Sequence, residues 1–194
     1  MTVKDDWPHK YIPRKNLKIF KIFDIIIIEM RKGAKMNYTR NHDPNFYEEH
    51  QSIANCGSFA FQVEEWYAPD DYFEDDKGIC IEAWIEEGLE EGCSEYDLSD
   101  GLAEILTTYI LNDFEDVRYL MWPSELQDGE ELIAFRTFVD DNCNWDFHFK
   151  VYRNGLWQEK CGSDPVRFCD EWDWNNGLLD YISCTFYFAR KLES

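Results

Sequence analysis

Apolar residues recur at helical intervals in two stretches of the chain. Between Asn55 and Pro69 they occupy every third or fourth position, Asn55 is a favourable N-cap residue, and Pro69 would end the helix. In residues 98–114 the same spacing puts the leucines and isoleucines on one side, with Ser99 as the candidate cap. The pattern therefore predicts two amphipathic helices before residue 115.

The segments around these helices have weaker patterns. Residues 37–50 are polar and aromatic and are predicted to form a loop, and residues 70–76 are predicted to form an acidic loop. Residues 79–85 fit either a strand or a helix. Residues 86–97 hold six acidic residues and two glycines, which predicts an exposed segment.

Beyond residue 130 the period changes from helical to alternating, as is typical of strands. Strands are predicted at residues 131–139, 146–152, 156–160 and 178–190. Asn154 and Gly155 are the most favourable pair for a two-residue hairpin turn between the second and the third. Helices followed by an antiparallel sheet predict an α+β fold, with N-terminal helices packed on a small antiparallel sheet.

The hairpin turn also predicts which side chains meet. With a two-residue turn, Lys150 lies opposite Glu159, and His148 lies opposite Cys161. These side chains share one face of the sheet, so Glu159 is the diagonal neighbour of His148. Diagonal neighbours are about 7–8 Å apart at the backbone, which lets a long carboxylate reach an imidazole.

The composition adds a strong negative charge to this picture. The 194 residues carry a formal net charge of −21, with 44% hydrophobic and 17% aromatic residues. The aromatic content predicts a packed core, and the charge excludes a protein that binds bare nucleic acid or an anionic membrane. Enzymes with small substrates, binders of basic partners and mimics of nucleic acid are still compatible with it.

The charge is unevenly distributed along the chain. Residues 1–35 carry nine Lys or Arg and four Asp or Glu, a net of +5, which leaves −26 for residues 36–194. This change of sign predicts a basic N-terminal extension, 1–35, and a single acidic domain, 36–194. The extension is either a basic arm or translated upstream sequence. The second alternative arises because purine-rich codons for residues 32–35 would resemble a ribosome-binding site before Met36.

The seven cysteines are odd in number and include no CxxC pair, and the carboxylates form no calcium-loop pattern. No metal and no cofactor are therefore expected. No signal peptide is visible, and the apolar run 25–28 is far too short to span a bilayer. The sequence predicts a cytoplasmic protein with reduced thiols and no contact with membranes.

Cys56, His148 and Glu159 form a candidate catalytic constellation. Cys56 lies at a predicted helix start, where unpaired amides and the helix dipole favour a thiolate, and Gly57 is the candidate oxyanion donor. His148 would act as the base and Glu159 would orient it, which is the logic of a thiol protease. The alternatives are a small buried cysteine, a structural histidine and a cross-strand ion pair between Lys150 and Glu159.

Three segments carry a resemblance to a known family. They are Asn55-Cys56-Gly57-Ser58-Phe59-Ala60, Asp146-Phe147-His148-Phe149 and Asn154-Gly155-Leu156-Trp157-Gln158-Glu159-Lys160-Cys161-Gly162. Over roughly residues 55–189 the chain resembles small phage and bacterial proteins similar to the NlpC and CHAP branches of the papain-like cysteine peptidase and amidase fold. The resemblance implies that Cys56 is the nucleophile, His148 the general base and Glu159 the third residue.

The segments also depart from the family pattern at three positions. Glu159 lies where the related hairpins often have His, Cys161 where they have Pro, and Gly57 where an aromatic residue is common.

Two functions are compatible with these features. As an enzyme, the chain would be a thiol hydrolase that cuts an amide in a peptide or a peptidoglycan-like substrate. As a binding protein, it would be an acidic inhibitor that mimics nucleic acid and binds a basic nuclease, as inhibitors of the anti-CRISPR or anti-restriction type do. The carboxylates for such a partner are Asp70, Asp71, Glu74, Asp75, Asp76, Glu86, Glu87, Glu90 and Glu91. A third interpretation is an acidic surface that only promotes solubility.

Overall fold

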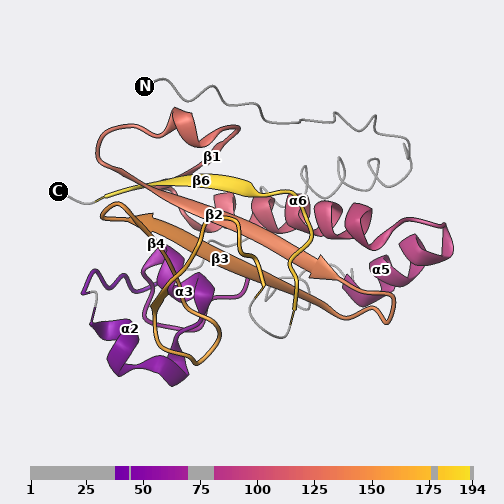
Figure 1. Ribbon diagram of the computed structural model, residues 1–194, viewed down its shortest axis with the longest axis horizontal. Coiled ribbons are helices and arrows are strands. Elements are labelled where there is room, and N and C mark those ends of the chain that lie inside the picture. The colour runs from indigo at the N-terminus through magenta and orange to yellow at the C-terminus, as the bar shows by residue number, and fades with distance from the viewer. Residues whose placement is uncertain (1–37, 44, 70–80, 176–178, 193–194) are drawn as a thin grey trace. The chain divides into compact units, whose positions relative to one another are not determined.

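The computed structural model describes residues 38–43, 45–69, 81–175 and 179–192, all of them within the unit Gly33–Ser194. In these residues a few helices pack against a six-stranded antiparallel sheet, which confirms the α+β class (Figure 1). Among the described residues, no helix is long and apolar enough to cross a bilayer. The predicted extension 1–35 and the acidic positions 70–76 lie outside the described residues.

The sheet has the strand order β1-β6-β2-β3-β4-β5. Its strands are β1 Val117–Leu120, β2 Glu130–Val139, β3 Trp145–Arg153, β4 Leu156–Glu159, β5 Arg167–Phe168 and β6 Phe186–Lys191. The long central strand β2 pairs with β3 on one side and with β6 on the other. The predicted hairpin is confirmed, because Lys150 pairs with Glu159, and Asn154 and Gly155 both have positive φ, as such a turn requires.

The two ends of the sheet differ from the prediction. The final strand begins at Phe186 and not at residue 178, because Tyr181 and the residues near it lie against the sheet face instead of joining its edge. Strands β1 and β5 were not predicted. With four and two residues, they are too short to show a period of two in the sequence.

The helices with defined bounds are α2 Phe46–Glu49, α3 Cys56–Phe61, α5 Ile81–Glu90 and α6 Glu95–Asp113, with two 3₁₀ turns at Gln51–Ile53 and Pro123–Glu125. Helix α2 lies inside the predicted loop 37–50. Of residues 79–85, for which a strand and a helix were both possible, the described residues 81–85 belong to the helix α5. The predicted helix after Asn55 is much shorter than expected, because Gln62 adopts a left-handed conformation with φ 54° and ends it.

The start of α6 also differs from the prediction. Ser94 is the N-cap, and it forms a capping box with Asp97. Ser99 is buried within the helix, and its backbone carbonyl accepts a hydrogen bond from the Thr137 hydroxyl of β2. Helix α6 therefore begins earlier than the apolar period suggested, and its cap lies in the acidic segment.

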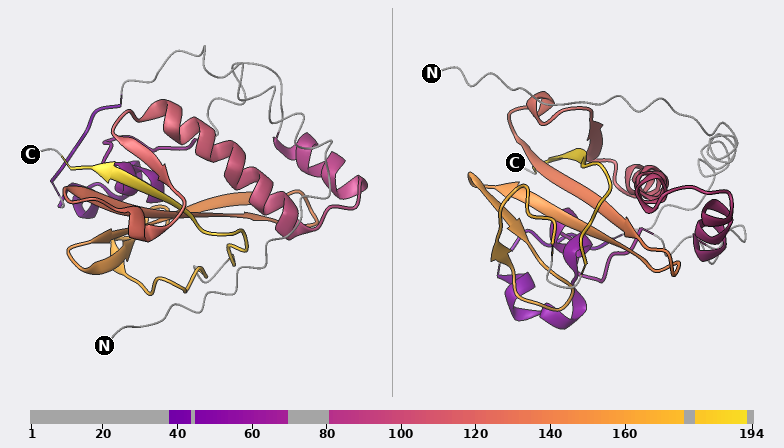
Figure 2. Two further views of the ribbon diagram at one scale, coloured as in Figure 1. Left: turned by 90° about the horizontal axis from the view of Figure 1, so that it is seen from above. Right: turned by 45° about the vertical axis from the view of Figure 1, so that its right-hand side comes forward.

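The two faces of the sheet are covered by different parts of the chain (Figure 2). Helices α3 and α6 cover one face, where Phe149 of β3 contacts Phe61 of α3 at 5.1 Å and stacks on Phe135 of β2 at 4.6 Å between ring centroids. On the opposite face Trp174 and Tyr181, from the segment between β5 and β6, join a buried apolar cluster. His148 and Glu159 belong to this second face.

Candidate active site

Cys56 is the first residue of α3, and the cap that precedes it is firmly held. The Asn55 side chain accepts a hydrogen bond from the Ser58 amide at 2.9 Å and donates one to the Tyr67 carbonyl at 2.8 Å. The predicted cap is thus confirmed. Gly57 is required here, since a Cβ atom at this position would lie 2.7 Å from the Tyr67 ring and 2.8 Å from its carbonyl oxygen. The helix start is therefore fixed by close packing.

Cys56 approaches β3 at a place where β4 does not extend. The register of β4 covers residues 150–153 of β3, so the backbone on either side of His148 is not paired with β4. The Cys56 thiol lies 3.9 Å from the carbonyl oxygen of Phe147, to which it donates, and it interacts with the backbone amide of Phe149. The thiol is therefore placed against the two peptides that flank His148.

Burial makes the Cys56 thiolate unfavourable. Loss of solvation raises the pKa of Cys56 to about 12, although the backbone amides of Phe149 and Gly57 act in the opposite direction. The expectation that the helix start would favour a thiolate is wrong for this conformation, because the cost of desolvation exceeds the effect of the amides. The thiol is neutral at pH 7.

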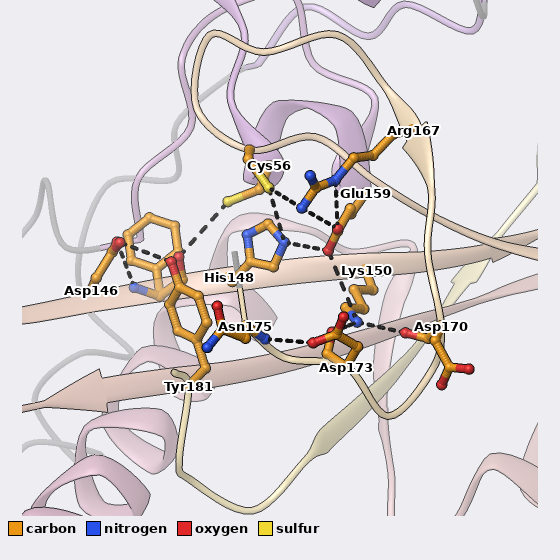
Figure 3. Close-up of polar contacts among 12 residues, drawn as sticks. Cys56, Asp146, His148, Lys150, Glu159, Arg167, Asp170, Asp173, Asn175 and Tyr181 are labelled. Atoms are coloured by element: carbon orange, nitrogen blue, oxygen red, sulfur yellow. Dashed lines mark hydrogen bonds and ion pairs between the residues drawn. The ribbon is translucent and has the colours of Figure 1, made fainter. Parts of the chain in front are cut away.

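His148 and Glu159 are joined as the hairpin predicted. The His148 Nε2 atom lies 3.0 Å from a carboxylate oxygen of Glu159, and the two side chains are only 4% and 6% exposed (Figure 3). Because the carboxylate accepts, Nε2 donates and Nδ1 is left as the basic nitrogen. Among the described residues, no hydrogen bond joins Cys56 to His148.

Two cations complete the surroundings of Glu159. Arg167 of β5 donates to one carboxylate oxygen at 2.8 Å, and Lys150 lies 3.9 Å from the other. Burial raises the pKa of Glu159, but the hydrogen bond and charge of His148, with Lys150 and Arg167, outweigh it and hold that pKa below its usual value. Glu159 is thus an ionised partner for His148, and the cross-strand pair with Lys150 is also present.

A segment before β6 covers His148, and we call its described residues, 170–175 and 179–183, the cover segment. The Tyr181 ring stacks on the imidazole at 5.3 Å between centroids, and its hydroxyl donates to Asp146 at 2.9 Å (Figure 3). Lys150 holds the other end by donating to the carbonyls of Asp170 and Asp173. The site is closed by contacts to residues of its own strand, β3.

Cys161 is a member of the site that the sequence did not assign to it. Its sulfur lies 3.9 Å from His148 Nε2 and 3.5 Å from an Arg167 nitrogen. The hairpin register already placed Cys161 opposite His148. That register is the signal in the sequence that places Cys161 beside His148.

The acidic positions predicted to bind a partner fall into two groups. Asp70, Asp71, Glu74, Asp75 and Asp76 lie outside the described residues. The others are exposed on α5 and just after it, and we call them the α5 carboxylates: Glu86, Glu87, Glu90 and Glu91. Within the described part of the chain, none of these four forms an ion pair.

No family model, no curated protein and no solved structure matches this chain. The papain-like resemblance therefore stays a prediction from three short segments.

Proposed function

We propose that the chain is a thiol hydrolase of papain-like architecture that cuts an amide bond in a peptide or peptidoglycan-like substrate. The observation that carries this proposal is the hydrogen bond from His148 Nε2 to Glu159, which leaves Nδ1 as a base. The Cys56 thiol, at the start of a helix, contacts the backbone of the neighbouring residue Phe147. A cysteine at a helix start and a histidine on an adjacent hairpin also support the architecture.

The reaction follows from these positions. The Cys56 thiol transfers its proton to His148 as the sulfur attacks the carbonyl carbon, and the amides of the first turn of α3, including that of Gly57, stabilise the oxyanion. His148 then protonates the leaving amine, and a thioester forms on Cys56. Water hydrolyses the thioester with His148 as the base, which restores the thiol.

The described conformation is the closed, resting one. Tyr181 and Trp174 lie against His148, and the Cys56 thiol is buried and neutral, so a substrate must displace the cover segment before attack. Because opening and proton transfer both have to occur, a substrate-like electrophile is a sharper test than a small alkylating agent.

The experiment is labelling of the full chain with a peptidyl vinyl sulfone, followed by peptide mapping. We expect an adduct on Cys56, and we expect His148→Ala to slow it by about 10²-fold, the usual contribution of a general base. The matched control is His50→Ala, which removes an exposed histidine that precedes Asn55 in the sequence. No adduct, or labelling of Cys56 that does not depend on His148, would refute the hydrolase.

A second candidate function rests on the α5 carboxylates. They are exposed, close together and without ion pairs among the described residues, which suits a binder of a basic protein such as a nuclease. Neutralising all four to Gln should weaken binding to a basic ribonuclease and flatten its salt dependence. The control neutralises Glu48, Glu49, Asp128 and Asp141, which are exposed elsewhere. If the two variants have equal effects, the α5 carboxylates act only as part of the general surface charge and form no specific binding site.

A further inference from the structure

His148, Glu159 and Cys161 bring three different ligand types together in one place. A nitrogen, a carboxylate oxygen and a sulfur from these residues all lie within 4.8 Å of one another. His148 and Glu159 are buried, and Cys161 is half-buried. Because two of the three ligands come from a paired hairpin and the third directly follows it, the backbone holds them in a fixed relation.

We propose that His148 Nε2, a Glu159 carboxylate oxygen and Cys161 Sγ form a binding site for a divalent transition-metal ion, with Zn²⁺ as the ion that suits this ligand set. Zinc accepts nitrogen, oxygen and sulfur ligands in a tetrahedral arrangement, with bonds of about 2.0–2.3 Å that put ligand atoms roughly 3.3–3.8 Å apart. The nitrogen lies 3.0 Å from the carboxylate oxygen and 3.9 Å from the sulfur, so small movements are sufficient. A water molecule completes the coordination.

Arg167 already places a positive charge at this position. Its guanidinium donates to Glu159 at 2.8 Å and lies 3.5 Å from the Cys161 sulfur. Its side chain is 50% exposed, so it can move into solvent when a metal ion enters. The site therefore exchanges one cation for another, and Arg167 competes with the metal.

Metal binding would change the protonation of Cys161 and His148, and this change affects catalysis. The Cys161 thiol releases its proton to solvent, and the proton on His148 Nε2 moves to Nδ1 of the neutral ring as Nε2 becomes a ligand. A metal-bound His148 then has no free basic nitrogen, so the ion inhibits the hydrolase. This consequence rests on the proposed function, but the metal site itself does not.

The experiment titrates the purified, metal-stripped full chain with Co²⁺ and follows the thiolate-to-cobalt charge-transfer absorption. We expect one equivalent to bind with this absorption and Zn²⁺ to displace it. Cys161→Ser should abolish the absorption and weaken Zn²⁺ binding by more than about tenfold. Cys169→Ser is the matched control, since Cys169 lies on the neighbouring segment but is outside the cluster, and it should bind as the wild type does.

Two further variants separate this inference from the proposed function. Arg167→Gln should tighten Zn²⁺ binding, because the competing cation is gone. Cys56→Ala should leave binding unchanged whether or not Cys56 proves to be a nucleophile. The inference is overturned if the wild type gives no thiolate absorption, if the absorption survives in both Cys161→Ser and Cys161→Ala, or if Cys56→Ala abolishes it.

Discussion

Two buried carboxylates, Glu131 of β2 and Glu159 of β4, lie on opposite faces of the sheet and are neutralised by different partners. Glu131 lies on the face covered by α3, between Arg153 and Arg190, and Arg190 also donates to the Ala60 carbonyl of α3 at 2.9 Å. Glu159 lies on the other face with His148, the half-exposed Arg167 and Lys150. One sheet thus contains two similar charges in dissimilar surroundings.

The partners of each carboxylate determine whether its cluster can take part in a reaction. Guanidinium groups stay protonated at any ordinary pH, and Arg190 is buried. The partners of Glu131 therefore neither exchange protons nor move into solvent without breaking the cluster. The partners of Glu159 include an imidazole, whose second ring nitrogen can accept a proton, and an arginine whose half-exposed side chain can rotate out into solvent. The first cluster attaches α3 to the sheet, whereas the second has the chemistry of a functional site.

The largest effect is expected from Glu131→Gln. This change leaves two arginines without their carboxylate, one of them fully buried, and breaking such a pair costs about 3–5 kcal/mol. Chemical denaturation should show a loss of this size, and the variant should be the least stable of those considered. A loss below about 1 kcal/mol would mean that solvent reaches Arg190, so that the partners of Glu131 can be solvated as Arg167 can.

Glu159→Gln should cost less, about 1.5–3 kcal/mol, because Arg167 can be solvated and Lys150 keeps its backbone carbonyls. The pKa of Glu159 is below its usual value of about 4.3, so its contribution to stability is present above that pH and is lost as pH falls through the lower value in the folded state. The wild type should therefore lose stability below about pH 4 more steeply than the variant. Parallel pH profiles of unfolding would contradict the assignment.

Removal of the cover over His148 should make the Cys56 thiol more reactive. In the wild type, iodoacetamide at pH 7 should label Cys56 more slowly than the exposed Cys184, because Cys56 is buried and its pKa is raised to about 12. Tyr181→Ala should speed its labelling about tenfold or more, since a stacked ring and a hydrogen bond together contribute about 1.5–3 kcal/mol to closure. Tyr181→Phe keeps the ring and should have a smaller effect. Equal rates in all three proteins would show that the cover segment does not control access.

The hairpin illustrates what could be predicted from the sequence. A two-residue turn leaves one register, so the meeting of His148 and Glu159 followed from Asn154-Gly155 and a period of two. The state of the Cys56 thiol did not follow, because the thiol is buried against Phe147 and Phe149 of β3, and Phe147 is 91 residues away in the sequence. The capped start of α3 was local and predictable. Its early end at Gln62 was not, because the residues there pair with a segment that precedes the helix: the Asn41 amide donates to the Gln62 carbonyl, and Arg40 forms a β-bridge with Val63.

The smallest effects on stability are expected from exposed carboxylates. They test whether burial determines how much a carboxylate contributes to stability. Glu90 ends α5, where no basic residue balances the helix dipole, and Glu86 precedes it by one turn, so Glu90→Lys should raise stability by about 0.5–1 kcal/mol at low salt. Glu95 lies in the first turn of α6, where an acidic residue is favourable, so Glu95→Lys should lower stability by about 0.3–1 kcal/mol. Both changes in stability should become smaller in 1 M salt, because salt screens exposed charges much more than buried pairs. If either exposed change matched the cost of Glu159→Gln, the distinction between the buried clusters and the acidic surface would fail.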